Sequence, residues 1–249
     1  MNVSILSYNI WGMPWGCKNI EELLIWIFCQ SGAEIVCLQE VFSHHHRLII
    51  QEKTSAAHWR AYFPDDPCWL GTCLNSFRSG SGLCILVKPS IKVLDEFPFV
   101  PYKNVDSYIE KLVCKGYFGL SLQKGNISFT LINTHMISDV TDCSPFRIAH
   151  GHSRRLQEKQ LLEAGQTISQ PVLIVGDLNQ EEHHYFYRMY PDEDYTFPST
   201  LEQLDHVVCL SRDKNCFEIK EVCFFQDIPF SDHIPLKVTV QLKSKDKAD

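Results

Sequence analysis

The sequence has no long hydrophobic run and no basic leader. Its longest apolar stretches, Leu23–Cys29 and Leu83–Val87, are much shorter than the roughly 20 residues that a membrane-spanning helix needs. Residues Met1–Ser4 lead directly into an apolar stretch, without a basic segment or a small-residue cleavage site, so we expect no secretory signal. These absences predict a protein of the cytoplasm or of the membrane periphery, with no transmembrane segment.

Positive charge is also scarce. The chain has 23 Lys and Arg residues against 30 Asp and Glu residues, a formal net charge of -7. Proteins that bind nucleic acid or anionic membranes through broad electrostatic attraction carry an excess of positive charge. Nucleic acid is therefore the less expected partner, although a local basic groove is compatible with this composition.

A disulfide framework, internal repeats and low-complexity linkers are absent as well. The chain has 11 cysteines, an odd number, and they lie scattered in apolar runs, as at Cys29, Cys37 and Cys84, without the regular spacing of small secreted proteins. We expect most of them to be reduced, buried thiols.

A hydrophobic content of 45% over 249 residues predicts one domain over residues 1–242, followed by a disordered charged tail over residues 243–249.

Short β-type runs alternate with amphipathic helical stretches along the chain. The expected strands are Val3–Tyr8, Ile35–Leu38, Gly82–Val87, Tyr117–Leu122, Ser128–Asn133, Val172–Val175, His206–Leu210 and Leu236–Leu242. The expected helices are Ile20–Gln30, Phe42–Ser55 and Ile148–Ser169, and long loops are expected at Ala57–Gly82 and Phe97–Asp106. Helices after the first two strands, with hairpin-like spacing later, predict an α/β (α+β) fold in which helices flank a pair of mixed sheets.

Polar side chains that suit catalysis follow four of the expected strands and precede the last one. They are Asn9, Glu40, His135, Asp177 with Asn179, and Asp232 with His233. An unpaired buried polar group costs roughly 1–3 kcal/mol, so five such positions indicate a shared purpose. Carboxylates with amide partners favour a hard cation, Mg²⁺ or alternatively Mn²⁺ or Ca²⁺, and the imidazoles can supply the proton transfers of phosphoester hydrolysis.

Six motifs in a fixed order carry a family resemblance. They are SYNIWG, CLQE, NTH, GDLN, LDHV and SDHIPL, and they extend over nearly the whole chain. In this order they resemble the magnesium-dependent endonuclease/exonuclease/phosphatase superfamily, which has a deoxyribonuclease I-like fold. The resemblance implies a four-layered sandwich of two mixed β-sheets flanked by helices. It also implies an active site at the edge where the strand ends converge.

The resemblance assigns roles to the matching carboxylates and amides. It makes Glu40 the main magnesium ligand, with Asn9 close to it. Asp177 and Asn179 are expected to orient the attacking water and the phosphate. Asn179 is thus expected to contribute both to catalysis and to substrate binding.

The resemblance also assigns roles to the histidines and the remaining carboxylates. His233, paired with Asp232, is expected to be either the general base or a phosphate-binding imidazole. His135 is expected to contact the phosphate or to assist the leaving group. Asp205 matches an acidic position of the family, and His206 stands where an aromatic residue is more common. His206 either adds a titrating group near the site or packs there.

Three segments are similar to the neutral sphingomyelinase branch of the superfamily. They are Asn9–Pro14, Gly80–Ile85 and Lys115–Leu120, and in this branch Lys115 would neutralise a phosphate oxygen. Five aromatic residues of the expected loops either shelter an apolar tail and dip into an interface, or fill the core. They are Trp69, Phe77, Phe97, Phe99 and Tyr102.

The expected function is a magnesium-dependent phosphodiesterase of the sphingomyelinase type, which releases phosphocholine from a sphingolipid or lyso-lipid. The expected partner is a small phosphoester or phospholipid substrate, with peripheral membrane contact. Two enzymatic alternatives on the same fold are a nuclease and an inositol-phosphate-type phosphatase. A binding protein that has lost catalysis is the third alternative, although every ligand and imidazole named above is present.

Overall fold

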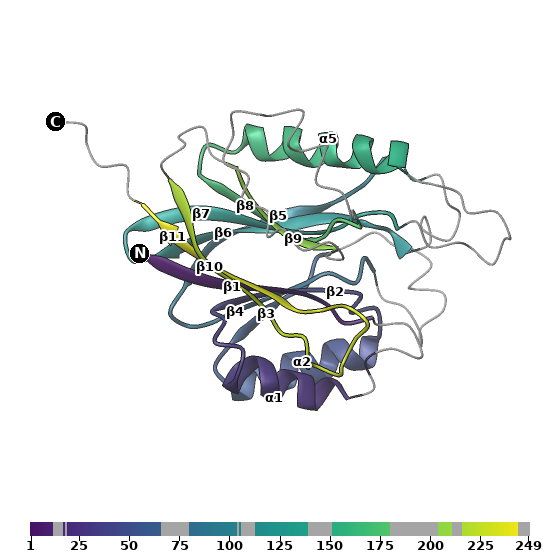
Figure 1. The fold of residues 1–249 in the computed structure, drawn as a ribbon, viewed down its shortest axis with the longest axis vertical. Coiled ribbons are helices and arrows are strands. Elements are labelled where there is room, and N and C mark those ends of the chain that lie inside the picture. Colours follow the sequence, from purple (N-terminus) through teal and green to yellow (C-terminus); the bar gives the residue numbers. More distant parts are fainter. Residues whose placement is uncertain are drawn as a thin grey trace, which may run out of the picture.

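The computed structural model describes residues 1–11, 17, 19–65, 80–103, 105, 113–138, 151–179, 204–210 and 216–243. Its elements are β1 (Asn2–Asn9), α1 (Ile20–Cys29), β2 (Ile35–Gln39), α2 (His44–Ala56), β3 (Arg60–Tyr62), β4 (Cys84–Val87), β5 (Lys92–Pro101), β6 (Gly116–Lys124), β7 (Ile127–His135), α5 (Gly151–Thr167), β8 (Val172–Asp177), β9 (Asp205–Leu210), β10 (Phe217–Phe224) and β11 (Leu236–Leu242). The strands form a six-stranded sheet in the order β10-β11-β1-β2-β4-β3 and a five-stranded sheet in the order β5-β6-β7-β8-β9. The two sheets pack face to face (Figure 1).

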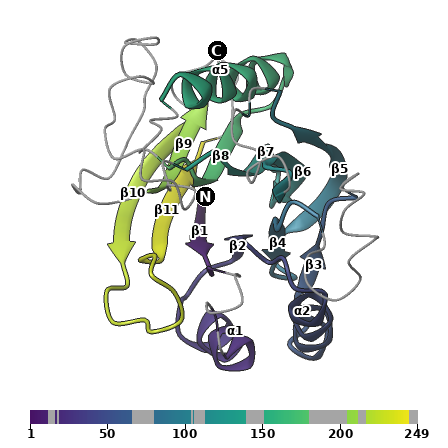
Figure 2. The same cartoon turned by 90° about the vertical axis from the view of Figure 1, so that its right-hand side faces the viewer.

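Each sheet contains one parallel pair of strands among antiparallel neighbours. In the six-stranded sheet β1 runs parallel to β2, and in the five-stranded sheet β7 runs parallel to β8. Parallel neighbours require a crossover connection, and the helices α1 and α5 lie in these two connections. Figure 2 shows α1 and α2 on the outer face of the six-stranded sheet and α5 on the outer face of the five-stranded sheet. The predicted four-layered sandwich of two mixed sheets is therefore confirmed.

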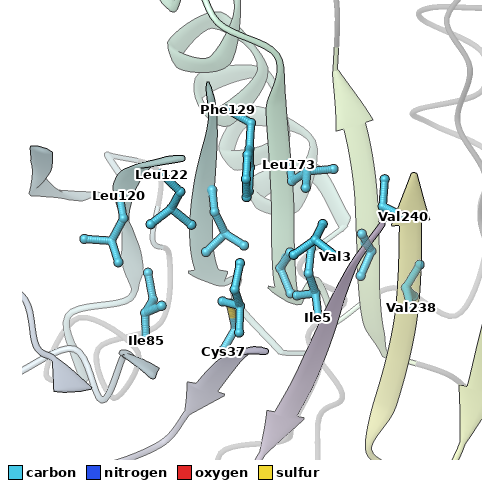
Figure 3. Close-up of a cluster of buried hydrophobic side chains, with 14 of the residues drawn as sticks. Val3, Ile5, Cys37, Ile85, Leu120, Leu122, Phe129, Leu173, Val238 and Val240 are labelled. Atoms are coloured by element: carbon cyan, nitrogen blue, oxygen red, sulfur yellow. The ribbon is translucent and has the colours of Figure 1, made fainter. Parts of the chain in front are cut away.

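Three apolar clusters lie between these four layers. The central cluster joins the two sheets, and Figure 3 shows Val3 and Ile5 of β1 opposite Phe129 of β7 and Leu173 of β8. A second cluster packs α1 and α2 against the outer face of the six-stranded sheet, and a third packs α5 against the five-stranded sheet. Both faces of each sheet are thus covered, which explains why strands such as Ile35–Gln39 are buried along their whole length.

The strands that the sequence did not predict are all at sheet edges. They are β3 and β10, at the two edges of the six-stranded sheet, and β5, at one edge of the five-stranded sheet. Edge strands pack on fewer neighbours, so β5 is largely exposed and carries two prolines, which weakens its strand pattern. The predicted loop Phe97–Asp106 is therefore wrong over residues 97–101, and the predicted loop Ala57–Gly82 contains β3.

The helix predictions hold, with shifted ends. The helix expected at Phe42–Ser55 begins at His44, because the Ser43 side chain caps it by accepting from the backbone N–H of His46. The helix expected at Ile148–Ser169 is α5, which begins at Gly151, and residues 148–150 lie outside the described part of the chain. The expected tail also lies outside it from residue 244 onward.

Two findings concern membrane-spanning helices and cysteines in the described part of the chain. None of their helices is both long enough and apolar enough to cross a membrane. The eight described cysteines are free, and five of them are buried: Cys17, Cys37, Cys84, Cys209 and Cys216. The expected burial of Cys29 is wrong: it is the last residue of α1 and is exposed.

Candidate active site

The site lies where the inward-facing rows of the strands change from apolar to polar. Side chains alternate along a strand, so every second residue points into the space between the sheets. The inward rows are Val3, Ile5, Ser7 and Asn9 in β1; Ile35, Cys37 and Gln39 in β2; Phe129, Leu131, Asn133 and His135 in β7; Leu173, Val175 and Asp177 in β8; and Asp205, Val207 and Cys209 in β9. Because the carboxyl ends of both parallel pairs meet at the same end of the sandwich, their polar residues converge there.

Asn9 connects the two carboxylates of the site. Its Nδ2 donates to Oδ2 of Asp177 at 2.9 Å and to Oε1 of Glu40 at 3.2 Å. Its Oδ1 accepts from the backbone N–H of Trp11 at 2.9 Å, which determines the orientation of the amide. Asn9 therefore lies beside Glu40 as expected, and it faces both carboxylates with its nitrogen.

His135 and Lys115 complete the side of the site that belongs to the five-stranded sheet. Nε2 of His135 lies 3.4 Å from Oδ2 of Asp177 and 3.9 Å from Oε1 of Glu40. Nζ of Lys115 and Nδ2 of Asn179 both donate to the backbone carbonyl of Met136, at 3.0 and 2.9 Å. Lys115 is only 5% exposed, so it acts as a buried positive charge near the carboxylates.

His233 pairs with Asp205 and not with Asp232. Nδ1 of His233 lies 2.9 Å from Oδ2 of Asp205, whereas Asp232 is exposed and its Oδ1 lies 3.3 Å from Oγ of its neighbour Ser231. The predicted pairing of adjacent residues is therefore wrong. Ser231 positions the histidine: its Oγ donates to the backbone carbonyl of Asn9 at 2.7 Å and accepts from the backbone N–H of His233 at 3.1 Å. The Ser-x-His spacing is the sequence signal of such a side-chain turn.

Burial shifts the pKa values of the acidic groups in the direction that disfavours charge. It raises the pKa of the Glu40 carboxyl, and it raises the pKa of Asp177 to about 6, against the opposing effects of His233 and Lys115. Burial also lowers the pKa of His135 well below its usual range, and the nearby charges of Lys115 and His233 act in the same direction. The two carboxylates thus lack full charge compensation within the described residues.

His233 has the opposite shift. Burial alone would lower its pKa, but the hydrogen bond and the charge of Asp205, together with the charge of Asp177, outweigh this effect and raise the pKa to about 10. At neutral pH the imidazole is therefore protonated. Nδ1 is occupied by Asp205, while Nε2 lies 3.8 Å from Oδ2 of Asp177 and faces the carboxylates.

Unusual backbone conformations gather at the same strand ends. Five described residues other than glycine have a positive φ, and three of them lie at the site: Trp11 at 47°, Glu40 at 63° and Asn179 at 51°. Such conformations cost on the order of 1–3 kcal/mol each and concentrate at functional sites. Gly176, at φ 145°, lies against the carbonyl of Thr134, where any side chain would clash. This close approach places Asp177 directly beside His135 in the register of β7 and β8.

The donor set suits a hard divalent cation. The described residues contain no cluster of three or more His, Cys, Asp or Glu side chains arranged to hold a metal ion. Magnesium, however, is commonly bound by one or two carboxylates, with the remaining positions taken by water and substrate phosphate. The undercompensated carboxylates of Glu40 and Asp177 match that pattern. Asn9, whose Oδ1 is engaged by Trp11, fits the role of a bridge between the carboxylates better than that of a direct ligand.

Several predicted residues lie elsewhere. His206 follows the inward-facing Asp205, so it points to the α5 side of its sheet, where it is buried and does not reach the site. Phe99 belongs to the core between the sheets, and Tyr102 packs in the cluster under α5. These two aromatics therefore form no surface for an apolar tail. Trp69 and Phe77 lie outside the described residues.

Comparison with known proteins places this geometry in a family. No curated protein matches the chain in sequence. Among solved structures, the human Nocturnin catalytic domain with bound sulfate anion is similar at a TM-score of 0.69, with 16% identity, over 97% of this chain and 94% of that one. Sphingomyelinase C from Streptomyces griseocarneus is similar at 0.66, with 18% identity, over 96% and 99%. TDP2 of D. rerio complexed with single strand DNA product is similar at 0.68, with 12% identity, over 96% and 99%.

At these identities the similar structures establish the fold alone. The family assignment comes from a sequence model, that of the endonuclease/exonuclease/phosphatase family, which matches residues 6–233 and thus includes the motifs from SYNIWG to the histidine of SDHIPL. The chain belongs to the endonuclease/exonuclease/phosphatase family.

Proposed function

We propose that this protein is a metal-dependent phosphodiesterase of the sphingomyelinase type. The observation that carries the proposal is the convergence, at one end of the sandwich, of two undercompensated carboxylates and a carboxylate-held imidazolium. Glu40 and Asp177 are joined through Asn9, and the Asp205–His233 pair lies 3.8 Å from Asp177. A phosphodiester carries negative charge, so it fits between a cation held by the carboxylates and the positive imidazole.

Each of these residues would have a different role in the reaction. Asp177 and Asn179 would orient a water molecule for in-line attack on phosphorus. His233 is protonated at neutral pH, which supports a phosphate-binding role. The sequence alone did not choose between this role and that of general base. Nε2 of His135 lies beside the carboxylates of Asp177 and Glu40, which supports a contact with the phosphate or with the leaving oxygen.

The cation would be held by Glu40, with Asp177 next to it. When bound, it supplies Lewis-acid polarisation of a phosphate oxygen. Lys115 would act on the phosphate through its charge and without direct contact, because its side chain is buried and its ammonium group donates to the carbonyl of Met136. This role differs from the direct phosphate contact that the sequence suggested.

Two observations support a lipid phosphodiester as substrate. The segments Asn9–Pro14, Gly80–Ile85 and Lys115–Leu120 are similar to the neutral sphingomyelinase branch, and sphingomyelinase C is among the similar structures. The net charge of -7 favours this substrate over nucleic acid, which TDP2 of D. rerio holds as a product. A soluble phosphodiester or a lyso-lipid would use the same residues.

A substrate panel tests the proposal. Hydrolysis of sphingomyelin, a lyso-phosphocholine lipid, an abasic DNA duplex and an inositol phosphate is measured with Mg²⁺ and with a chelator. We expect release of phosphocholine that stops on chelation and returns with Mg²⁺. The Glu40→Ala variant should lose this activity, and the Glu52→Ala variant, which changes an exposed carboxylate on α2, should keep it.

Each result of the panel has a distinct meaning. Turnover of only the DNA duplex or only the inositol phosphate would replace the lipid substrate and keep the metal-dependent chemistry. Equal activity with and without the chelator would overturn the role of the cation. If a folded protein hydrolyses none of the four phosphoesters, the non-catalytic alternative replaces the proposal.

A further inference from the structure

The candidate site is divided between the two sheets. Asn9 and Glu40 follow strands of the six-stranded sheet, and Asp205 begins a strand of the five-stranded sheet. His233 comes from the segment before β11, which belongs to the six-stranded sheet. The hydrogen bond between His233 and Asp205 therefore crosses from one sheet to the other, and its geometry depends on how firmly Asp205 is held.

Ser7 holds the second oxygen of Asp205. Its Oγ donates to Oδ1 of Asp205 at 2.8 Å, while Oδ2 of the same carboxylate lies 2.9 Å from Nδ1 of His233. Ser7 is fully buried and Asp205 is 1% exposed, so no bulk water competes for either oxygen. Ser7 lies on β1, so this hydrogen bond also crosses between the sheets.

The direction of the Ser7 hydroxyl follows from its close partner, because a carboxylate oxygen is an acceptor. Nε2 of Gln39 lies farther away, 3.5 Å from Oγ of Ser7, and also donates to the carbonyl of Cys37 at 3.2 Å. The same nitrogen donates to Oδ1 of Asn133 at 2.9 Å, and Nδ2 of Asn133 donates to the carbonyls of Leu38 and Cys84 at 3.0 and 2.9 Å. The hydroxyl proton of Ser7 is therefore directed to Asp205.

We propose that Ser7 is a positioning residue that holds the Asp205 carboxylate against the imidazole of His233. For catalysis this inference rests on the function proposed above, because His233 acts there on the phosphate. Ser7 is fully buried, so it would touch no substrate. Its loss leaves a buried carboxylate oxygen without its donor, which loosens the partner that orients the imidazole.

The test compares Ser7→Ala with Ser4→Ala. Ser4 lies on the same strand and also shares a hydroxyl contact across strands, with Oγ1 of Thr239 at 3.2 Å, but at the other end of the sheet. For Ser7→Ala we expect kcat to fall by about 10- to 100-fold, as for other residues that orient a catalytic group, with KM unchanged. Ser7→Thr, which keeps the hydroxyl, should restore most of the activity, and Ser4→Ala should keep normal kcat.

A second readout does not depend on activity. The proton on Nδ1 of His233, held by Asp205, should give a downfield NMR resonance, assigned by its loss in His233→Ala. We expect this resonance to shift or broaden in Ser7→Ala and to stay unchanged in Ser4→Ala. A purely structural role of Ser7 would lower the unfolding midpoint and leave kcat per folded molecule and this resonance unchanged, which would overturn the proposal.

The two readouts separate this inference from the proposed function. If the wild-type protein hydrolyses no phosphoester but the resonance still responds to Ser7→Ala, the proposed function fails while the positioning of Asp205 by Ser7 stands. If the wild-type protein is active and Ser7→Ala has normal kcat, the inference fails and the proposed function stands. If Ser7→Ala does not fold, Ser7→Cys, which has a similar volume and a weaker donor, takes its place beside Ser4→Cys with the same expected contrast.

Discussion

The two ends of the sandwich differ in how they compensate the charge of a partly buried carboxylate. At the end away from the site, Glu34 precedes β2 and is joined to Lys124 of β6, whose Nζ lies 2.7 Å from Oε1 and 2.5 Å from Oε2. At the site, Glu40 follows the same strand β2, and its Oε1 is met by the amide of Asn9 at 3.2 Å and by His135 at 3.9 Å. The side chains of Glu34 and Glu40 are similarly exposed, at 20% and 16%.

The difference shows which end favours stability and which is arranged for binding. Lys124 and Glu34 connect the two sheets directly, and the backbone N–H of Ser4 and the hydroxyl of Ser90 also donate to the Glu34 carboxylate. At the site end, positive backbone dihedral angles and carboxyls with raised pKa values accumulate within the same few residues. Such unfavourable features persist where a ligand compensates for them.

The largest effect expected from this contrast is the loss of activity in His233→Ala. Removal of the charged imidazole should lower kcat by about 10²- to 10³-fold, the usual cost of losing one donor that stabilises negative charge in the transition state. The measurement is steady-state hydrolysis of the substrate identified in the panel. His152→Ala, an exposed histidine of α5, is the control. Near-normal activity in a folded His233→Ala protein would remove His233 from the reaction.

The next effect concerns the opposite end. Lys124→Met should lower the free energy of unfolding by about 1–3 kcal/mol, because it leaves the partly buried Glu34 carboxylate without its charged donor. Activity per folded molecule should stay unchanged. Urea unfolding and the substrate assay measure the two quantities. Lys159→Met, which breaks the exposed pair with Glu163, should have a much smaller effect on stability. If both variants lose the same stability, the two sheets are not held together by Lys124.

The smallest expected effect is a gain in stability, whereas the preceding variant loses stability. Burial raises the pKa of Asp177 from 3.8 to about 6 in the folded protein, so protonation of this carboxyl favours the folded state. That contribution is complete below pH 3.8 and is lost as the pH rises through about 6. At pH 7 Asp177→Asn should therefore raise the free energy of unfolding by on the order of 1 kcal/mol while it abolishes activity.

Thermal unfolding of Asp177→Asn at two pH values measures this effect. The gain in stability should be present at about pH 7 and absent near pH 3.5, where the carboxyl is neutral in both states. A loss of stability at neutral pH would show that the charged carboxylate is stabilised in the folded protein, and the contrast between the two ends would not hold.

Much of the fold could be predicted because the alternation of side chains along a strand and the burial of apolar residues both depend on short stretches of sequence. The predicted strands of the two parallel pairs are present, since their side chains are buried on both faces and give strong apolar patterns. The strands β3, β5 and β10 were missed because they lie at sheet edges, where exposure allows charges and prolines that resemble loops.

The sequence predicted which residues belong to the site but not which of them are in contact. The amino-acid sequence by itself determined that polar residues end the inward rows of several strands, because a period of two places Asn9, His135 and Asp177 on the same side as the apolar residues before them. It also carried the order of motifs that identifies the family. These properties are local, so they can be read without knowledge of neighbouring strands.

Only the tertiary structure decided which of these residues meet. His233 pairs with Asp205, 28 positions away, and not with the adjacent Asp232, because the packing of the two sheets brings the start of β9 against the segment before β11. The same packing directs Ser7 to Asp205, 198 positions away. Hydrogen bonds act over about 3 Å, so distance in space and not along the chain selects the partners.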